Sequence, residues 1–230
     1  MSAFLQVKSV SVGYGETEVV HGVNLELRRG EFFGILGASG CGKSTLLGAI
    51  AGVLPLRGGQ VVLEGEDITG VSPSKRNIGM VFQEPLLFAG RSVGWNVEYG
   101  LRARRVSHTE RDQRVRELLG RVELSDYAQA RVETLSGGQA HRVALARALA
   151  PRPRVLLCDE PLSALDARLK QRLLEQLPEI LDGVTCIYVT HDARELRGLA
   201  DRVAVMETGS FIAEGSLEQL AADPGAAPYL

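Results

Sequence analysis

Apolar and polar residues follow two patterns along this chain of 230 residues. Residues 7–12 and 23–27 alternate between apolar and polar side chains, which predicts strands with one face exposed to water. Residues 32–36, 155–158 and 186–190 are continuous apolar runs, which is typical of strands buried on both faces of a parallel sheet. The chain is therefore predicted to contain both kinds of strand.

Helical patterns separate these strands. Residues 43–52 and 167–177 predict helices, and the longer stretch 85–150 has helical periodicity, with many helix formers at 111–119. Strands that alternate with helices imply a mostly parallel sheet. The long helical stretch is then predicted to be a subdomain inserted before the second buried strand.

The C-terminal region is predicted to contain a hairpin. Residues 202–206 and 210–214 have the pattern of strands, and Thr208-Gly209 between them is a turn signal. The segment 221–230 is rich in Ala and Pro, and we expect it to be loosely held.

Composition and charge narrow the functional classes. The chain is 45% hydrophobic and 23% charged, with a net charge of −2. This overall charge does not indicate a basic surface for binding nucleic acid or anionic lipid. No apolar run approaches the ~20 residues that cross a bilayer, and the N-terminus lacks the pattern of a signal peptide. Cys41, Cys158 and Cys186 have no metal-binding spacing, and the last two are expected in the core. These features predict a cytoplasmic location.

A glycine-rich segment follows the first buried strand and opens a helix. Residues 37–44 read GASGCGKS and fit the phosphate-binding pattern G-x-x-x-x-G-K-[ST]. Glycines let backbone N–H groups point at phosphate oxygens, and the helix N-terminus adds a favourable dipole. Lys43 is expected to reach the β- and γ-phosphates, and Ser44 to bind Mg²⁺. The alternative is a turn that only caps the helix.

Polar residues end the next two buried strands. Asp159 and Glu160 follow an apolar run, and the carboxyl ends of parallel strands form the ligand-binding edge of such a sheet. Asp159 is predicted to hold Mg²⁺ and Glu160 to polarise a water molecule. His191 ends the following strand and could bind a γ-phosphate. The alternatives are a solvated strand end and a structural histidine.

These motifs together resemble the nucleotide-binding subunit of an ABC transporter over essentially the whole chain. The matching segments are Gly37–Thr45 (Walker A), Gln83 (Q-loop), Leu135–Gln139 reading LSGGQ (signature), Val155–Glu160 (Walker B), Ser163–Asp166 (D-loop) and His191 (switch histidine). Tyr14 precedes the phosphate loop and resembles the aromatic residue that stacks on adenine. A turn or core tyrosine is the alternative for Tyr14.

The resemblance implies an α/β fold of the P-loop NTPase, ABC-ATPase type. Its mostly parallel sheet core, residues 1–84 and 151–230, would carry an N-terminal antiparallel β subdomain and an inserted helical subdomain, residues 85–150. ATP and Mg²⁺ would be the cofactors. The catalytic residues would be Lys43, Gln83, Glu160 and His191, and the metal ligands Ser44, Gln83 and Asp159. The ATP site would contain Tyr14, Gly37, Ala38, Ser39, Gly40, Cys41, Gly42, Lys43, Ser44, Thr45, Gln83, Ser136, Gly137, Gly138, Gln139 and Asp166.

The signature also implies partners. In this family two copies pair head to tail around two ATP molecules, so that Ser136 to Gln139 of one copy face the phosphate loop of the other. A helix that begins near Gly138 would offer free N–H groups to a γ-phosphate, and Asp166 would lie across the interface. The remaining expected partners are transmembrane permease subunits and, indirectly, a substrate-binding protein. The chain would then act at the cytoplasmic face of the membrane, without nucleic acid.

The segments Lys75–Gln83 and Trp95–Leu101 resemble importer subunits for ferric iron, polyamines, sulfate, molybdate or thiamine. Because the chain ends soon after the terminal hairpin, we expect no appended regulatory domain. An exporter subunit of the lipoprotein or macrolide type is the alternative function. DNA-repair ATPases of the family need a long coiled coil, and only 135 − 45 = 90 positions separate Thr45 from Leu135. Translation factors of the family need two cassettes.

Three further features are open to interpretation. His141 stands where a polar Gln or Arg is more usual, and we expect a helix-surface residue without a role. Phe88 and Trp95 either line a groove for the membrane subunit or belong to the subdomain core. The basic run is expected to be a solvated helix face; it comprises Arg102, Arg104, Arg105, Arg111, Arg114 and Arg116.

Overall fold

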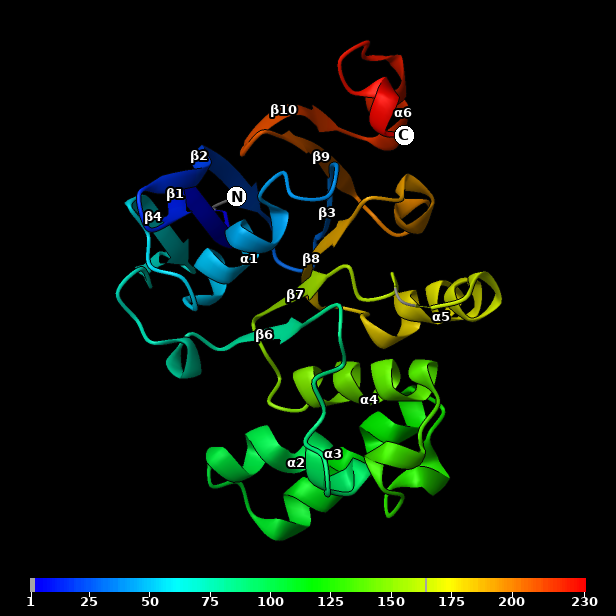
Figure 1. The fold of residues 1–230 in the computed structure, drawn as a ribbon. Coiled ribbons are helices and arrows are strands. Elements are labelled where there is room, and N and C mark those ends of the chain that lie inside the picture. The colour runs from blue at the N-terminus through cyan, green and yellow to red at the C-terminus, as the bar shows by residue number, and fades with distance from the viewer. Residues whose placement is uncertain (1–2, 164) are drawn as a thin grey trace.

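The computed structural model describes residues 3–163 and 165–230, and Figure 1 shows them as two sheets with helices between and below. The first sheet has four strands in the order β2-β1-β4-β5. Its strands are β1 (Leu5–Tyr14), β2 (Thr17–Leu27), β4 (Gly58–Leu63) and β5 (Glu66–Asp67). All three pairings in this sheet are antiparallel.

The second sheet has six strands in the order β10-β9-β3-β8-β7-β6. Its strands are β3 (Phe32–Leu36), β6 (Ile78–Val81), β7 (Val155–Asp159), β8 (Thr185–Thr190), β9 (Arg202–Glu207) and β10 (Ser210–Gly215). Every neighbouring pair is parallel except the hairpin of β9 and β10. The predicted fold class, a mostly parallel core with an antiparallel N-terminal sheet, is confirmed.

Helices pack on both sides of the parallel sheet (Figure 1). The helix α1 (Lys43–Ala51) contacts β1 and β7 and so lies between the two sheets. Helices α2 (Val93–Ala103), α3 (His108–Arg121) and α4 (Gly137–Leu149) form the inserted helical region, which lies below β6 in Figure 1. Helices α5 (Ala167–Ile180) and α6 (Leu217–Ala222) follow later in the chain.

Alternate side chains of the central strands divide the core into two clusters. Phe33 and Ile35 of β3 point into the cluster formed with α1 and the antiparallel sheet. Phe32 and Leu36 of the same strand point into the cluster formed with α2 to α5. Successive side chains of a strand alternate between faces, so a continuous apolar run fits a strand that is covered on both sides. Cys158 and Cys186 are buried in the second cluster, as predicted.

The C-terminal segment differs from the prediction. Residues 221–230 were predicted to be loose, but Ala226 is fully buried in the helical-side core and Tyr229 packs against that core. The Tyr229 hydroxyl donates a hydrogen bond to Glu207 Oε1 at the end of β9. Proline interrupts regular secondary structure, but an Ala- and Pro-rich composition does not prevent small side chains from filling a gap against the sheet.

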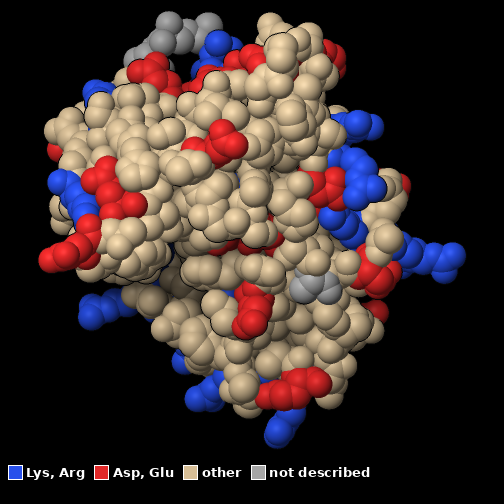
Figure 2. Space-filling model, turned by 45° about the horizontal axis from the view of Figure 1, so that its top comes forward, with Lys and Arg blue, Asp and Glu red and all other residues tan. Residues whose placement is uncertain are grey.

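The surface carries charges of both signs. On the face drawn in Figure 2, basic and acidic side chains are interspersed, and uncharged residues cover most of the area. This distribution fits the net charge of −2.

Candidate functional site

The phosphate loop connects β3 to α1, and its glycines are needed by its conformation. Gly42 caps α1 with a φ of 108°, which side-chain-bearing residues rarely adopt. A Cβ on Gly37 would lie 2.3 Å from the carbonyl oxygen of Met206 in the neighbouring strand β9. The loop can therefore follow this path beside the sheet only with glycine at these two positions.

Lys43 is the first residue of α1, and its side chain folds back over the loop. Only 4% of the side chain is exposed, and the ammonium donates hydrogen bonds to the carbonyl oxygens of Gly37 (2.8 Å) and Ala38 (2.9 Å). Its Nζ also lies 3.5 Å from Oε1 of Glu160. A buried ammonium is thus held where α1, the loop and β7 meet, by oxygen acceptors that an anionic ligand could replace.

Ser44 and Asp159 lie side by side next to this ammonium. The Ser44 hydroxyl donates to Asp159 Oδ1 at 2.9 Å. Burial raises the pKa of the Asp159 carboxyl, and the Ser44 hydrogen bond opposes that shift. A hydroxyl and a partly buried carboxylate are the oxygen donors that Mg²⁺ takes, with phosphate oxygens and water completing its shell. These residues fit a magnesium site.

Glu160 and His191 form a second pair at the same edge. His191 Nδ1 lies 2.9 Å from Glu160 Oε2, and the histidine side chain is about half exposed, at 49%. Glu160 has a φ of 45°, a left-handed conformation that is uncommon for a residue with a side chain and is stabilised here by its N–H bond to the Val189 carbonyl. The strained turn directs the carboxylate to the cavity that the phosphate loop lines.

A cavity of about 270 Å³ lies over the phosphate loop. It is lined by Val19, Ser39, Gly40, Gly42, Lys43, Ser44, Thr45, Gln83 and Glu160. Gln83 follows β6 and is exposed to this space. Tyr14 is 55% exposed and its hydroxyl lies 3.5 Å from Thr45 Oγ1, so it is not the core tyrosine of the alternative interpretation. The structure therefore brings together the loop, the two acids, His191, Gln83 and Tyr14.

The signature segment is not part of this cluster. It starts α4, in the helical region, and none of its residues lines the cavity over the phosphate loop. Ser136 and Gln139 form a capping box: Ser136 Oγ accepts from the Gln139 N–H, and Gln139 Oε1 accepts from the Ser136 N–H. The N–H groups of Gly137 and Gly138 belong to the first turn, where helices leave such groups without an intrahelical acceptor.

The two signature glycines have different surroundings. A Cβ on Gly138 would lie 2.3 Å from Leu169 Cδ2 on α5, whereas the nearest atom to a Cβ on Gly137 is Leu165 Cδ2 at 3.9 Å. Gly138 is thus required for the close packing of α4 on α5. Gly137 is exposed, and its backbone remains accessible to a ligand.

Asp166 caps the helix after Walker B. Its Oδ1 accepts hydrogen bonds from the N–H groups of Arg168 and Leu169, each at 3.1 Å, which fixes the start of α5. Ala164, in the middle of the predicted D-loop, lies outside the described residues. Asp166 is exposed, and it is not among the residues that line the cavity over the phosphate loop.

The prediction for His141 is wrong. Its side chain is buried with 6% exposure, between α4 and the segment after β6. Nδ1 lies 2.9 Å from the Gly137 carbonyl oxygen, and Nε2 lies 3.0 Å from the Gln83 carbonyl oxygen. The imidazole therefore links the start of the signature helix to Gln83. Helical periodicity could not show this contact, because the partner is 58 residues away.

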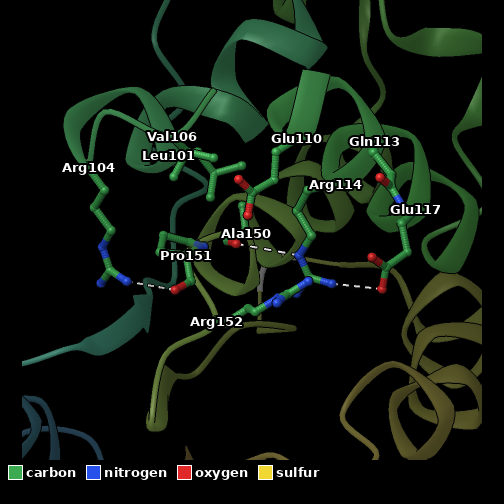
Figure 3. Close-up of a pocket in the computed structure, with 10 residues that line it drawn as sticks. All are labelled: Leu101, Arg104, Val106, Glu110, Gln113, Arg114, Glu117, Ala150, Pro151 and Arg152. Carbon is green, nitrogen blue, oxygen red and sulfur yellow. Dashed lines mark hydrogen bonds and ion pairs between the residues drawn. The ribbon is translucent and has the colours of Figure 1, made fainter. Parts of the chain in front are cut away.

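The basic run is more structural than predicted. Arg114 donates to the carbonyl oxygens of Leu149 and Ala150 and so satisfies the C-terminal end of α4. Arg104 donates to the carbonyl oxygen of Pro151, just beyond this helix; Figure 3 shows the bonds to Ala150 and Pro151. Arg114 also pairs with Glu117 at 2.7 Å. These side chains line a cavity of about 330 Å³, larger than that over the phosphate loop but remote from it. Its arginines serve helix packing, whereas Arg102 is a half-exposed surface residue.

An aromatic cluster is formed by Phe88, five residues after Gln83 in the chain, and by two residues of α2. Phe88, Trp95 and Tyr99 have ring centroids 4.5 to 5.4 Å apart, and Phe88 and Tyr99 are 39% and 44% exposed. Arg147 lies over the Phe88 ring. The rings are therefore not the subdomain core, and they form an exposed aromatic surface.

The fold and this edge define an α/β protein with a phosphate-binding loop. The model of the ABC transporter family matches residues 20–163, and the chain belongs to that family. The family resemblance predicted from the motifs is confirmed. No helix among residues 3–163 and 165–230 has the length and apolar character to span a membrane.

Relatives with assigned roles are ATP-binding subunits. The chain is 46% identical over 214 residues to the spermidine/putrescine import ATP-binding protein PotA of Thermotoga maritima, covering 92% of this chain and 58% of the relative. It is 48% identical to the Fe(3+) ions import ATP-binding protein FbpC of Streptomyces avermitilis, covering 92% and 62%. The chain thus spans about three fifths of the length of these relatives.

A solved structure supports the fold independently. The structure of cbiO1 from Clostridium perfringens, part of the ABC transporter complex cbiONQ, superposes with a TM-score of 0.86 at 31% identity. The match covers 97% of this chain and 92% of that chain.

Proposed function

We propose that this chain is the ATP-hydrolysing subunit of an ABC importer. The observation that carries the proposal is the convergence of a buried ammonium, a hydroxyl–carboxylate pair and a carboxylate–imidazole pair on one cavity, all within hydrogen-bond or ion-pair distance. Phosphoryl transfer to water requires these parts: charge neutralisation, a metal site and a base for the attacking water.

The phosphate loop binds the triphosphate. Lys43 exchanges its bonds to the Gly37 and Ala38 carbonyls for β- and γ-phosphate oxygens. Ser44 and Asp159 would hold Mg²⁺ together with the side-chain oxygen of Gln83, which lines the same cavity as Ser44. Held by these residues, the ion would supply charge neutralisation for the phosphates. Tyr14, exposed next to Thr45, stacks on the adenine.

Glu160 polarises the attacking water, and His191 orients the carboxylate and contacts the γ-phosphate. The separation of 2.9 Å between His191 Nδ1 and Glu160 Oε2 supports this pairing, because a base must be held in a fixed orientation to accept a proton. The left-handed backbone at Glu160 supports it too, since strain of this kind concentrates at functional sites.

The second half of each site comes from another copy. The first turn of α4 has free N–H groups at Gly137, which is exposed, and at Gly138, and such a helix terminus binds anions well. In the proposed head-to-tail dimer they meet the γ-phosphate on the partner's loop, and Asp166 approaches the same site. ATP then stabilises the dimer through contacts that ADP lacks, and hydrolysis releases it.

The exposed aromatic cluster is the docking site for a membrane subunit. Phe88, Trp95 and Tyr99 suit anchoring because aromatic side chains contribute most to protein interfaces. Phe88 belongs to the same segment after β6 as Gln83, so docking at the cluster can influence the nucleotide site through this segment. The subunit would thereby be held at the cytoplasmic face of the membrane. The importer names of the relatives favour import over the exporter alternative.

The substitution Glu160→Gln tests the proposal. We expect the purified chain to hydrolyse ATP with Mg²⁺, and the variant to lose at least about 10²-fold in kcat, because the water loses its base. ATP binding and ATP-driven dimerisation, measured by size-exclusion chromatography, should persist. Glu175→Gln, at an exposed position on α5, is the matched control. A wild-type chain without ATPase activity, or a variant with normal turnover, would contradict the proposal.

A further inference from the structure

An ion network joins α5 to the loop that carries His191. Lys170, one turn into α5, places its Nζ 3.0 Å from Asp192 Oδ2 and 2.5 Å from Glu195 Oε1. Asp192 directly follows His191, and Glu195 lies in the short 3-10 helix η4 (Ala193–Leu196) after it. A single lysine therefore contacts both ends of the loop segment that follows His191.

The carboxylate at the centre of this network is deeply buried. The Glu195 side chain is 2% exposed and also accepts a hydrogen bond of 2.8 Å from the Tyr188 hydroxyl in β8. A buried carboxylate is stabilised only when it is paired and hydrogen-bonded. Burial lowers the pKa of Lys170, but its bonds to Glu195 and Asp192 outweigh this effect and raise that pKa above its ordinary value. The network is thus a fixed ionic contact.

Asp192 is restrained from two sides. Arg194 donates to both of its carboxylate oxygens, at 2.8 and 2.9 Å, and Lys170 reaches the second oxygen from α5. Its main-chain N–H donates to Thr190 Oγ1 at the end of β8. The backbone next to His191 is therefore set by contacts that include one from a different element, α5.

The start of α5, one turn before Lys170, carries the predicted D-loop aspartate. Asp166 caps α5, and the Lys170 N–H donates to the Asp166 carbonyl oxygen at 2.9 Å. One helical turn thus separates Asp166 from the lysine. His191 in turn contacts Glu160. A continuous set of contacts runs from Asp166 through Lys170 and Asp192 to His191 and Glu160.

We propose that Lys170 is a positioning residue that makes the start of α5 and the His191 loop move as one body. This inference rests on the proposed function, in which Asp166 faces the partner's nucleotide site while His191 serves its own. Contact of Asp166 with a second copy then restrains the His191 loop, whose contact with Glu160 is already present in the single chain, so that closure of the dimer holds this pair in place during turnover. The first turn of α5, which separates Asp166 from Lys170, can transmit such a displacement because packed helices shift as rigid units.

Four variants separate positioning from simple stabilisation. Lys170→Met removes the cation, and Lys170→Arg keeps it. The double variant Lys170→Met/Glu195→Gln removes both charges, so that no unpaired carboxylate is left in the core. Arg172→Met, an exposed arginine two residues along α5, is the matched control. Thermal unfolding, kcat and KM for ATP, and ATP binding by the isolated chain are measured for each.

We expect Lys170→Met to lower kcat about tenfold or more with KM changed less than about twofold, because small displacements of catalytic groups reduce turnover strongly. Lys170→Arg should restore most of kcat. The double variant should regain thermal stability but not kcat. If the double variant regains both, the network is only stabilising and the inference is wrong.

A double-mutant cycle with Asp166→Ser, which keeps a capping oxygen, tests the transmission itself. We expect the two substitutions to be non-additive, so that Lys170→Met lowers kcat by less than about twofold once Asp166 is replaced. Effects that multiply would overturn the inference. If the wild-type chain shows no ATPase activity, the proposed function fails instead. The two failures can be told apart because the wild-type activity is measured by itself, without any variant.

Discussion

The edge of the parallel sheet and the start of α4 carry the two most specific motifs of the chain, and they are built differently. At the sheet edge, the side chains are bound to one another: Lys43 to the loop carbonyls, Ser44 to Asp159, and Glu160 to His191. At the start of α4, the side chains of Ser136 and Gln139 form a capping box with each other's main chain, and the first-turn N–H groups of Gly137 and Gly138 have no intrahelical acceptor.

The difference indicates which site one chain can assemble by itself. Strands from distant parts of the sequence converge at the sheet edge, so folding brings the acids, the lysine and the histidine together. The signature lies on the inserted helical region, and within residues 3–163 and 165–230 none of its residues lines the cavity over the phosphate loop. The comparison supports the proposal that the complete site has two parts, the sheet edge of one copy and the signature segment of another.

The largest expected effect is on assembly. In the Glu160→Gln background, Ser136→Arg should abolish ATP-driven dimerisation, since an oversized side chain in a close-packed interface costs about 1–3 kcal/mol and blocks the γ-phosphate. ATP binding by the monomer should not change. Ser125→Arg, at another exposed serine of the helical region, is the control. If the Ser136→Arg variant dimerises at the same ATP concentrations as the chain with Glu160→Gln alone, the signature segment does not complete the site of a second copy.

A smaller effect separates the two signature glycines. Gly138→Ala should be less stable than Gly137→Ala by about 1–3 kcal/mol in urea unfolding, because its Cβ would overlap Leu169. Gly138→Ala combined with Leu169→Ala should relieve that overlap. Equal stabilities for the two single variants would mean that Gly138 is not a packing residue, and both glycines would then belong to the ligand-facing surface.

The smallest effect concerns the sheet edge and its dependence on pH. The hydrogen bonds from Arg194 hold the pKa of Asp192 well below its ordinary value of 3.8. A carboxyl with a lowered folded-state pKa stabilises the fold above pH 4 and loses this contribution as the pH falls through the folded-state value. The difference in unfolding free energy between wild type and Asp192→Asn should therefore shrink by about 1 kcal/mol between pH 7 and pH 3. A difference that is constant with pH would show that Asp192 is not anchored by charge.

Local chemistry made the phosphate loop and its neighbours predictable. The loop requires glycine and lysine at set spacing beside a buried strand, and the acids that follow Cys158 end another buried strand. Each of the two signals is contained in a short segment of the chain. Parallel-strand topology then implies that the strand ends meet, so the cluster at the sheet edge could be expected before the structure was known.

Contacts between distant segments could not be predicted in the same way. His141 was expected on a helix surface, yet it binds the Gln83 carbonyl, because the path of the chain after β6 brings that carbonyl under α4. The contacts of Lys170 could not be predicted for the same reason, because its partners Asp192 and Glu195 lie 22 and 25 residues further along the chain. Pro178 lies inside α5, which extends to Ile180, so the helix continued past the predicted end at 177.

The amino-acid sequence by itself determined the order of strands and helices, the phosphate loop, the acidic strand end and the signature, because each depends on short-range backbone chemistry and on periodicity. Only the tertiary structure decided that Gly138 serves packing, that His141 and Lys170 are tied to functional loops, and that residues 221–230 pack on the core. These outcomes depend on which surfaces meet after folding, and burial against a distant segment leaves no periodic signal in the chain.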